Sequence, residues 1–162
     1  MSATQKLNEN INVVISNNTL DVFAKYRQIK SDHNESCGIL IGTHSVDGKR
    51  ITITCVTEPD EVDVRNKFSF RLRSVKHGDI LNKRFQCSGK QEVYLGTWHS
   101  HPEMVPTPSY CDISDWMKQF KKNNHIFDMM VFTIVGTSTT LYWLVLKGKL
   151  YQLDETNIIL SN

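Results

Sequence analysis

A short segment near residue 100 constrains the fold of this chain more than any other stretch. It reads Trp-His-Ser-His-Pro from residue 98 to residue 102. On an extended strand, successive side chains point to opposite faces of the sheet. A strand predicted over residues 93–99 therefore places His99 and His101 on one face, and Ser100 points away from them.

A stiff loop then turns the chain back toward the end of this strand. The run Pro-Thr-Pro at residues 106–108 locks two φ angles and leaves the loop few conformations. Ser109 opens an apolar-periodic run, which predicts a helix with Asp112 in its first turn. Three protein ligands leave the fourth tetrahedral position of a zinc ion to water, as in catalytic zinc sites. We therefore expect one zinc ion per chain, bound by His99, His101 and Asp112.

Two other interpretations of these residues stay open. The pair Ser109 and Asp112 has the spacing of a capping box, in which each side chain bonds to the backbone of the other residue. A metal-bound carboxylate has its oxygens committed, so we expect Asp112 to serve one role and not both. A His-x-His pair could also arise by chance in a chain with six histidines. A further carboxylate upstream favours the metal site.

That carboxylate is Glu35, which precedes the apolar run Cys-Gly-Ile-Leu-Ile-Gly. A glutamate that enters a buried strand costs free energy unless something polar requires it. Hydrolysis at zinc needs a base to take a proton from water and an acid to return it to the leaving group, and one carboxylate can do both. The alternative is that Glu35 is the last exposed residue of a loop.

Together these motifs resemble those of the JAMM (MPN-plus) metalloproteases, which include deubiquitinating subunits of the proteasome lid and the AMSH-type enzymes. The shared pattern is Glu before Cys-Gly-Ile-Leu-Ile-Gly, then Gly-x-Trp-His-Ser-His-Pro, then Pro-Thr-Pro-Ser-x-x-Asp. The resemblance implies a single MPN/JAB domain over residues 1–162, with a cytidine-deaminase-like α/β fold. Its mixed β-sheet would be flanked by helices.

The same resemblance assigns roles to individual residues. It implies that His99, His101 and Asp112 hold zinc and that Glu35 is the general base and acid. It also implies that Ser109 donates a hydrogen bond to the tetrahedral oxyanion.

A narrower similarity is to small bacterial JAB deconjugases encoded beside E1- and E2-like enzymes in antiphage operons of the CBASS type. It implies an isopeptidase that cuts after the C-terminus of a ubiquitin-like protein or a cGAS-like nucleotidyltransferase (CD-NTase). The expected partner is thus a protein with an extended C-terminal tail. The alternatives are a non-catalytic MPN scaffold, and a RadC-like, phage-tail or sulfur-carrier JAB peptidase.

The segment Pro59–Arg73 is the candidate binding place for such a tail, because JAMM enzymes can pair an inserted loop with the tail as an added strand. It lies between two apolar strands and carries Arg65, Arg71 and Arg73. The alternative is a routine surface hairpin with solvated arginines.

Composition agrees with a compact globular enzyme and adds limits. Hydrophobic residues make up 40% and charged residues 22%, and the formal charge of +2 is too small to indicate nucleic-acid binding. The N-terminus lacks the apolar core of a signal peptide and no run is long enough to span a bilayer, so we expect no membrane association and a cytoplasmic protein.

The four cysteines show neither disulfide-like nor zinc-like spacing, so we expect free thiols and no second metal. Cys37 shares a predicted strand face with Glu35 and could lie near the metal.

Hydrophobic periodicity supplies the other elements. Strands are expected over residues 10–16, 35–42, 51–57, 67–73, 93–99, 129–135, 140–146 and 150–153, with a turn over 46–48. The first helix would be capped by Asn18 or Thr19, a second would cover residues 74–87 with an interruption at Gly78, and a third would follow Ser109. The apolar stripe of the first helix comprises Leu20, Phe23 and Ala24, and that of the third comprises Ile113, Trp116, Met117 and Phe120.

Overall fold

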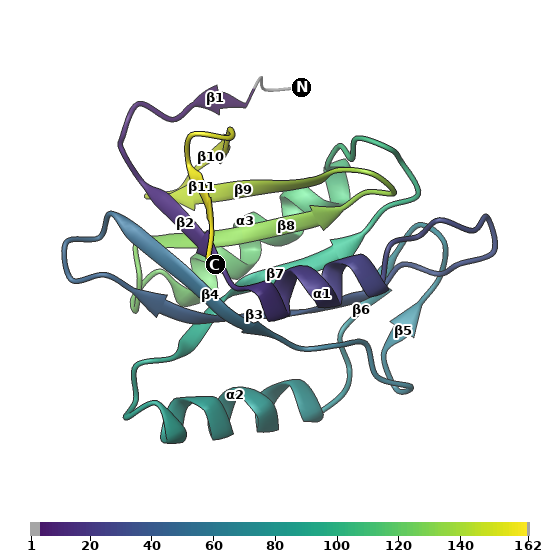
Figure 1. The fold of residues 1–162 in the computed structure, drawn as a ribbon, viewed down its shortest axis with the longest axis horizontal. Coiled ribbons are helices and arrows are strands. Elements are labelled where there is room, and N and C mark those ends of the chain that lie inside the picture. The colour runs from purple at the N-terminus through teal and green to yellow at the C-terminus, as the bar shows by residue number, and fades with distance from the viewer. Residues whose placement is uncertain (1–3, 162) are drawn as a thin grey trace.

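A mixed sheet of nine strands forms the centre of the structure, a computed structural model that describes residues 4–161 (Figure 1). In spatial order the strands are β1 (Gln5–Lys6), β10 (Lys149–Gln152), β9 (Thr140–Leu146), β8 (Met129–Val135), β7 (Val93–Ser100), β3 (Cys37–His44), β4 (Arg50–Val56), β2 (Asn12–Ile15) and β11 (Ile158–Leu160). Parallel pairing joins β1 to β10, β7 to β8, β2 to β4 and β11 to β2, and the other neighbours are antiparallel. The predicted α/β class with a mixed sheet is confirmed.

Three helices accompany the sheet within the described residues: α1 (Asn17–Lys25), α2 (Lys76–Cys87) and α3 (Tyr110–Asn123). In Figure 1, α1 lies in front of the sheet, α3 lies behind it, and α2 runs below it. Over residues 4–161, none of the helices combines the length and apolar character needed to cross a bilayer.

Each face of the sheet has its own apolar core. On the α1 face, Phe23 packs against Trp98 with ring centroids 5.3 Å apart. On the α3 face, Trp116 stacks on Phe132 at 5.1 Å and also meets Trp143. The central strands β7 and β8 are thus buried on both faces, which gives a rigid support to any group at their ends.

The first helix differs from the prediction at its start. Ser16, which directly follows β2, is the N-cap and accepts a hydrogen bond from the Thr19 amide at 3.3 Å. Asn18 and Thr19 both lie inside α1, so neither of them is the cap. Ala24 is exposed, and the apolar face uses Leu20 and Phe23 instead.

Other boundaries also differ from the predictions. The strand expected from residue 35 begins at Cys37, and the strand expected over 67–73 shrinks to β6 (Phe70–Arg71), which pairs only with β5 (Val64–Arg65). Helix α2 continues through Gly78, because that position faces open space and needs no special backbone. The short edge strands β1 and β11 carry no periodic signal and were not predicted.

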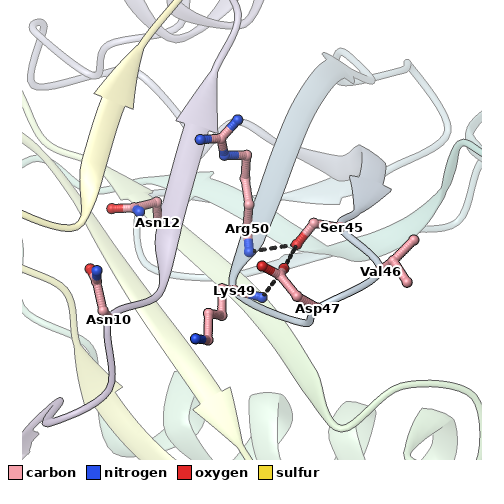
Figure 2. Close-up of a pocket in the computed structure, with 7 residues that line it drawn as sticks. All are labelled: Asn10, Asn12, Ser45, Val46, Asp47, Lys49 and Arg50. Carbon is pink, nitrogen blue, oxygen red and sulfur yellow. Dashed lines mark hydrogen bonds between the residues drawn. The ribbon is translucent and has the colours of Figure 1, made fainter.

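The turn between β3 and β4 was predicted and closes on its own polar groups (Figure 2). Ser45 Oγ donates to Asp47 Oδ1 at 2.6 Å, and the same carboxylate oxygen accepts the Lys49 amide at 3.0 Å. Ser45 Oγ accepts the Arg50 amide at 2.9 Å. This turn lies at the end of β3 remote from Glu35.

Candidate metal centre

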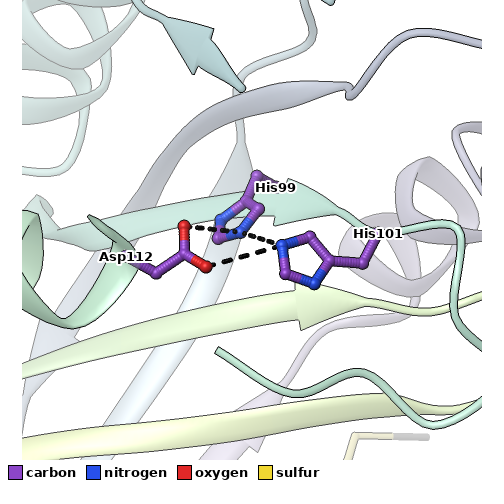
Figure 3. A group of neighbouring side chains, drawn as sticks. All are labelled: His99, His101 and Asp112. Atoms are coloured by element: carbon purple, nitrogen blue, oxygen red, sulfur yellow. Dashed lines mark hydrogen bonds and ion pairs between the residues drawn. The ribbon is translucent and has the colours of Figure 1, made fainter. Parts of the chain in front are cut away.

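Two imidazoles at the end of β7 and one carboxylate at the start of α3 meet in a single cluster (Figure 3). His99 Nε2 lies 3.1 Å from His101 Nε2. Asp112 Oδ1 lies 3.3 Å from His99 Nε2, and Asp112 Oδ2 lies 3.5 Å from His101 Nε2. Both imidazoles are buried and Asp112 is half-buried. The structure therefore brings together the three residues that the sequence assigned to zinc.

The geometry of this cluster fits a divalent cation. Without an ion, the two ring nitrogens 3.1 Å apart are compatible only if one carries a hydrogen and donates it to the other. A positive ion shared by the nitrogens and the carboxylate oxygens would let both nitrogens present lone pairs. Imidazole and carboxylate together are a donor set that zinc accepts.

The pKa values of the two imidazoles shift in opposite directions because their surroundings differ. Burial lowers the pKa of His99 and keeps this imidazole neutral, the form that binds metals. Burial also opposes the charge on His101, but the hydrogen bond with Asp112 and the nearby Asp112 and Glu35 carboxylates raise its pKa overall. Burial opposes the charge on Asp112 as well, yet hydrogen bonds from His101 and His99 hold the pKa of Asp112 well below its usual range.

Asp112 also completes a capping box with Ser109. The Ser109 amide donates to Asp112 Oδ2 at 2.7 Å, and the Asp112 amide donates to Ser109 Oγ at 3.1 Å. The capping alternative is therefore confirmed, and the carboxylate faces both histidines while it caps, with lone pairs on each oxygen left for a metal. The cap fixes the carboxylate for the cluster.

Glu35 reaches the cluster from the strand beside β7. Cys37 is the register partner of His99, so Glu35 falls beside His101, and its Oε1 lies 3.9 Å from His101 Nε2. The side chain is only 3% exposed. Burial raises the pKa of Glu35, His101 opposes this rise and Asp112 adds to it, and together they bring the pKa to about 8. The interpretation of Glu35 as an exposed loop residue is wrong.

Ser100 points away from the cluster, as predicted, and fastens the Glu35 segment to β7. Its Oγ accepts the Ser36 amide at 2.8 Å and donates to Gln28 Oε1 at 3.2 Å. The Ser100 amide also donates to the Ser36 carbonyl at 2.8 Å. These hydrogen bonds therefore hold the Glu35 segment beside the end of β7.

Three neighbours of the cluster were not predicted. Glu103 Oε2 lies 3.9 Å from His101 Nδ1, the outward nitrogen of that ring. The Phe70 ring packs on the His99 ring with centroids 4.8 Å apart, and the Asn66 carbonyl accepts the Glu35 amide at 2.7 Å. The position of Glu103, two residues after His101, could have revealed it; Phe70 and Asn66 come from a distant segment and carry no local signal.

A cavity of about 400 Å³ opens beside the cluster, between the β6 segment and α3. Its lining includes Glu35, Phe70, Arg71, Ser109, Asp112 and Trp116. The end next to the candidate metal centre is therefore acidic, and the remaining lining mixes aromatic with polar side chains.

All four cysteines are free thiols. Among residues 4–161, His99, His101 and Asp112 are the one group of His, Cys and acidic side chains close enough together to hold a metal ion. Cys37 is buried on the strand next to His99, and burial raises its pKa to about 12. It is therefore an inert thiol at neutral pH.

Comparison with known proteins finds relatives over most of the chain. A family model described as prokaryotic homologs of the JAB domain matches residues 19–147. A protein of Escherichia coli (strain TW11681) named CD-NTase/cGAS isopeptidase is 39% identical over 124 residues, which cover 76% of each chain. A Vibrio cholerae protein of the same name is 32% identical over 137 residues, 85% of this chain and 83% of that one. The solution structure of a protein from Desulfitobacterium hafniense superposes with a TM-score of 0.61 at 21% identity and 93% coverage of both chains, which supports the fold alone.

Proposed function

The chain belongs to the family of prokaryotic homologs of the JAB domain, as its motifs predicted, and we propose that it is a zinc-dependent isopeptidase. We propose further that it releases a CD-NTase or ubiquitin-like C-terminus from the lysines of its targets in CBASS-type antiphage signalling. The names of the similar E. coli and V. cholerae proteins support this substrate class.

One observation carries the proposal: a buried glutamate faces a complete set of zinc ligands. His99, His101 and Asp112 converge, and Glu35 lies 3.9 Å from the cluster nitrogen of His101. A non-catalytic scaffold needs neither the full set of ligands nor a carboxylate held at such a cost in burial. The scaffold alternative is therefore disfavoured.

Glu35 is the residue proposed to move the proton. It takes a proton from the attacking water and returns it to the lysine amine as the isopeptide C–N bond breaks. Burial that raises its pKa to about 8 suits a group that must both accept and release a proton near neutrality. Bound zinc would supply Lewis-acid polarisation of the water and of the scissile carbonyl.

Ser109 is proposed to stabilise the oxyanion. Its oxygen accepts the Asp112 amide, which leaves the hydroxyl hydrogen able to donate toward the cavity that it lines. Glu103 would orient His101 through the outward ring nitrogen, as outer carboxylates do for histidine ligands of metals.

The free edge of β6 is the proposed binding place of the substrate tail. The Asn66 amide donates to the Ser69 carbonyl, so Asn66 and Ser69 form a hydrogen-bonded pair of the hairpin. Hydrogen-bonded and non-hydrogen-bonded pairs alternate along an antiparallel ladder, so the next pair, Arg65 and Phe70, is not hydrogen-bonded. The backbone N–H and C=O of Phe70 therefore point away from β5. The residues of β6 line the cavity, so a tail added to this edge would run toward Glu35 and the cluster.

The central test combines metal analysis with cleavage. The substrate is a conjugate that joins a CD-NTase C-terminus to lysine, with a ubiquitin-like conjugate as comparison. The wild-type protein should contain one zinc ion per chain and release the lysine amine. The double variant His99→Ala, His101→Ala should lose most of its zinc and all measurable cleavage. Full zinc content in that variant would overturn the ligand assignment, and cleavage of neither conjugate would overturn the substrate class.

The tail path is tested at Leu72. Backbone N–H groups point alternately to the two sides of a strand, so the N–H of Leu72, two residues after Phe70, is also expected to point away from β5. Leu72→Pro removes that donor, whereas Leu72→Ala keeps it. Loss of one hydrogen bond worth about 1 kcal/mol should raise KM roughly fivefold in the proline variant alone. Equal KM values in both variants would place the tail elsewhere. Deletion of residues 63–66 is a poorer test, because Asn66 holds the Glu35 amide.

A further inference from the structure

A second buried polar network lies outside the metal centre and joins Thr57, directly after β4, to α2 and the 60–74 segment. His77 Nδ1 lies 2.6 Å from Thr57 Oγ1, and His77 Nε2 lies 2.8 Å from Asp63 Oδ2. The three residues are 5%, 1% and 7% exposed, in that order. Most buried polar side chains in folded proteins have a hydrogen-bond partner, and each of these three has one.

The proton arrangement of this network follows from its neighbours. Thr57 Oγ1 accepts the Ile39 amide at 2.9 Å, so its own hydrogen is free to donate to His77 Nδ1. His77 Nε2–H then donates to the Asp63 carboxylate. The order Thr, His, Asp resembles a nucleophilic triad, but the Thr57 hydroxyl is buried and already committed. The network is therefore built for position, not for attack on a substrate.

Asp63 holds the two ends of the 60–74 segment together through hydrogen bonds to the backbone, an arrangement that we call the clasp. Its Oδ2 accepts the Asp60 amide at 2.9 Å, on the incoming side. Its Oδ1 accepts the Arg73 and Ser74 amides at 2.8 Å and 3.0 Å, on the outgoing side. Burial raises the pKa of Asp63, but these backbone hydrogen bonds and the one with His77 outweigh it and lower the pKa to about 2. One carboxylate thus joins both ends of the segment to α2.

The clasped segment touches the metal centre at three places. The Asn66 carbonyl accepts the Glu35 amide at 2.7 Å, and Arg65 Nη1 donates to the Glu35 carbonyl at 3.4 Å. The Phe70 ring covers the His99 ring at 4.8 Å and a tilt of 34°. Ser100 holds Ser36 from the β7 side, but the amide and the carbonyl of Glu35 itself bond to residues 65 and 66, so a shift of this segment would move Glu35.

We propose that Asp63 and His77 are positioning residues for the hydrolytic site, which act through the 60–74 segment on Glu35. The inference rests on the proposed function, because it assigns Glu35 the proton transfer. Displacement of a proton-transfer group by 1 Å can cost about 10²-fold in rate. The zinc ligands come from β7 and α3, so loss of the clasp should leave the metal in place.

The experiment compares two substitutions of His77 with a matched control in the zinc-loaded protein. His77→Gln keeps an N–H that can reach Asp63, and His77→Leu fills the same space without it. We expect kcat on the conjugate to fall by about 10²-fold in His77→Leu and to recover to within about tenfold of wild type in His77→Gln. Zinc content should be unchanged in both.

The control is Asn157→Ala. Asn157 is also a buried polar anchor, which donates to the Ile11 carbonyl at 3.1 Å at the far edge of the sheet. This variant should lower Tm as His77→Leu does, with kcat unchanged. Hydrogen exchange of the Glu35 amide gives a readout that does not need activity: it should accelerate in His77→Leu and not in Asn157→Ala.

Two outcomes overturn the proposal: wild-type kcat in a folded His77→Leu protein, or unchanged exchange of the Glu35 amide. If His77→Leu does not fold, Asp63→Asn, which keeps one acceptor oxygen, serves the same comparison. Failure of the proposed function looks different, because Glu35→Gln would then be as active as wild type.

Discussion

The two ends of β3 carry polar clusters that differ in how their members are satisfied. At the far end, Ser45 and Asp47 bond to each other and to backbone amides, all within six residues. At the near end, Glu35 meets His99, His101 and Asp112, which come from other segments, and it has no side-chain hydrogen bond of its own among the described residues.

The difference separates a stabilising cluster from one suited to chemistry. Hydrogen bonds at the turn lower the pKa of Asp47, so its charge is favoured there. At the near end burial raises the pKa of Glu35 to about 8, so its charge is disfavoured. A buried group with a strongly shifted pKa beside a cavity is a candidate for function. The predictions below test this contrast.

The largest effect is expected from Glu35→Gln. Without the carboxylate, proton transfer is lost while the zinc ligands stay intact, so turnover should fall by several orders of magnitude. Zinc content and Tm should stay close to those of the wild type. Single-turnover cleavage of the lysine conjugate and elemental analysis provide the measurement, and full activity would reject the mechanism.

Ser109→Ala should have a smaller effect, on the order of 10²-fold in kcat, as for the loss of one oxyanion donor. Because Ser109 Oγ also accepts the Asp112 amide, Tm should fall by a few degrees as well. Ser109→Gly separates the two roles, since glycine is tolerated at an N-cap and has no hydroxyl. If Ser109→Ala loses stability and keeps its rate, the residue is only a cap.

Sequence reasoning succeeded where the signal was local. Strand alternation and the periodicity of α3 placed His99, His101 and Asp112 together, and the family motif identified Glu35 as their neighbour. It failed for the contacts made across long separations in the chain. Nothing in residues 60–74 indicates that Asp63 clasps the segment or that Phe70 covers His99, because such contacts depend on how distant elements pack.

The same limit explains the errors at the N-terminus and the edges. Ser16 outcompeted the predicted caps because β2 ends directly before it and sets where α1 starts. Strand β11 forms only because β2, some 145 residues earlier, offers a free parallel edge. Asp112 was expected to serve one role, whereas its carboxylate caps α3 and faces the histidines together; whether it does so with a metal bound stays a prediction.

A third prediction concerns pH and the metal-free protein. The folded-state pKa of Glu35, about 8, lies above its ordinary value of 4.5, so folding favours the protonated form. The contribution of Glu35 to the free energy of unfolding is complete below about pH 4.5 and is lost as pH rises through about 8. Thermal unfolding of metal-free wild type and Glu35→Gln should therefore diverge as pH rises. The Tm of wild type minus the Tm of the variant should be several degrees lower at pH 9 than at pH 5. Parallel curves would mean that Glu35 is not buried as described.

The smallest effect is expected at the far end of β3, from Ser45→Ala. This change removes the donor to Asp47 and the acceptor of the Arg50 amide, both near solvent, so the free energy of unfolding should fall by about 1 kcal/mol. Water can replace both bonds at the surface, and no contact of the turn reaches the metal centre. kcat, KM and zinc content should match the wild type. A slower enzyme would show that the two ends of β3 are coupled through the strand. A polar cluster whose hydrogen bonds are all local, like that of Ser45 and Asp47, would then have a role in activity as well as in stability.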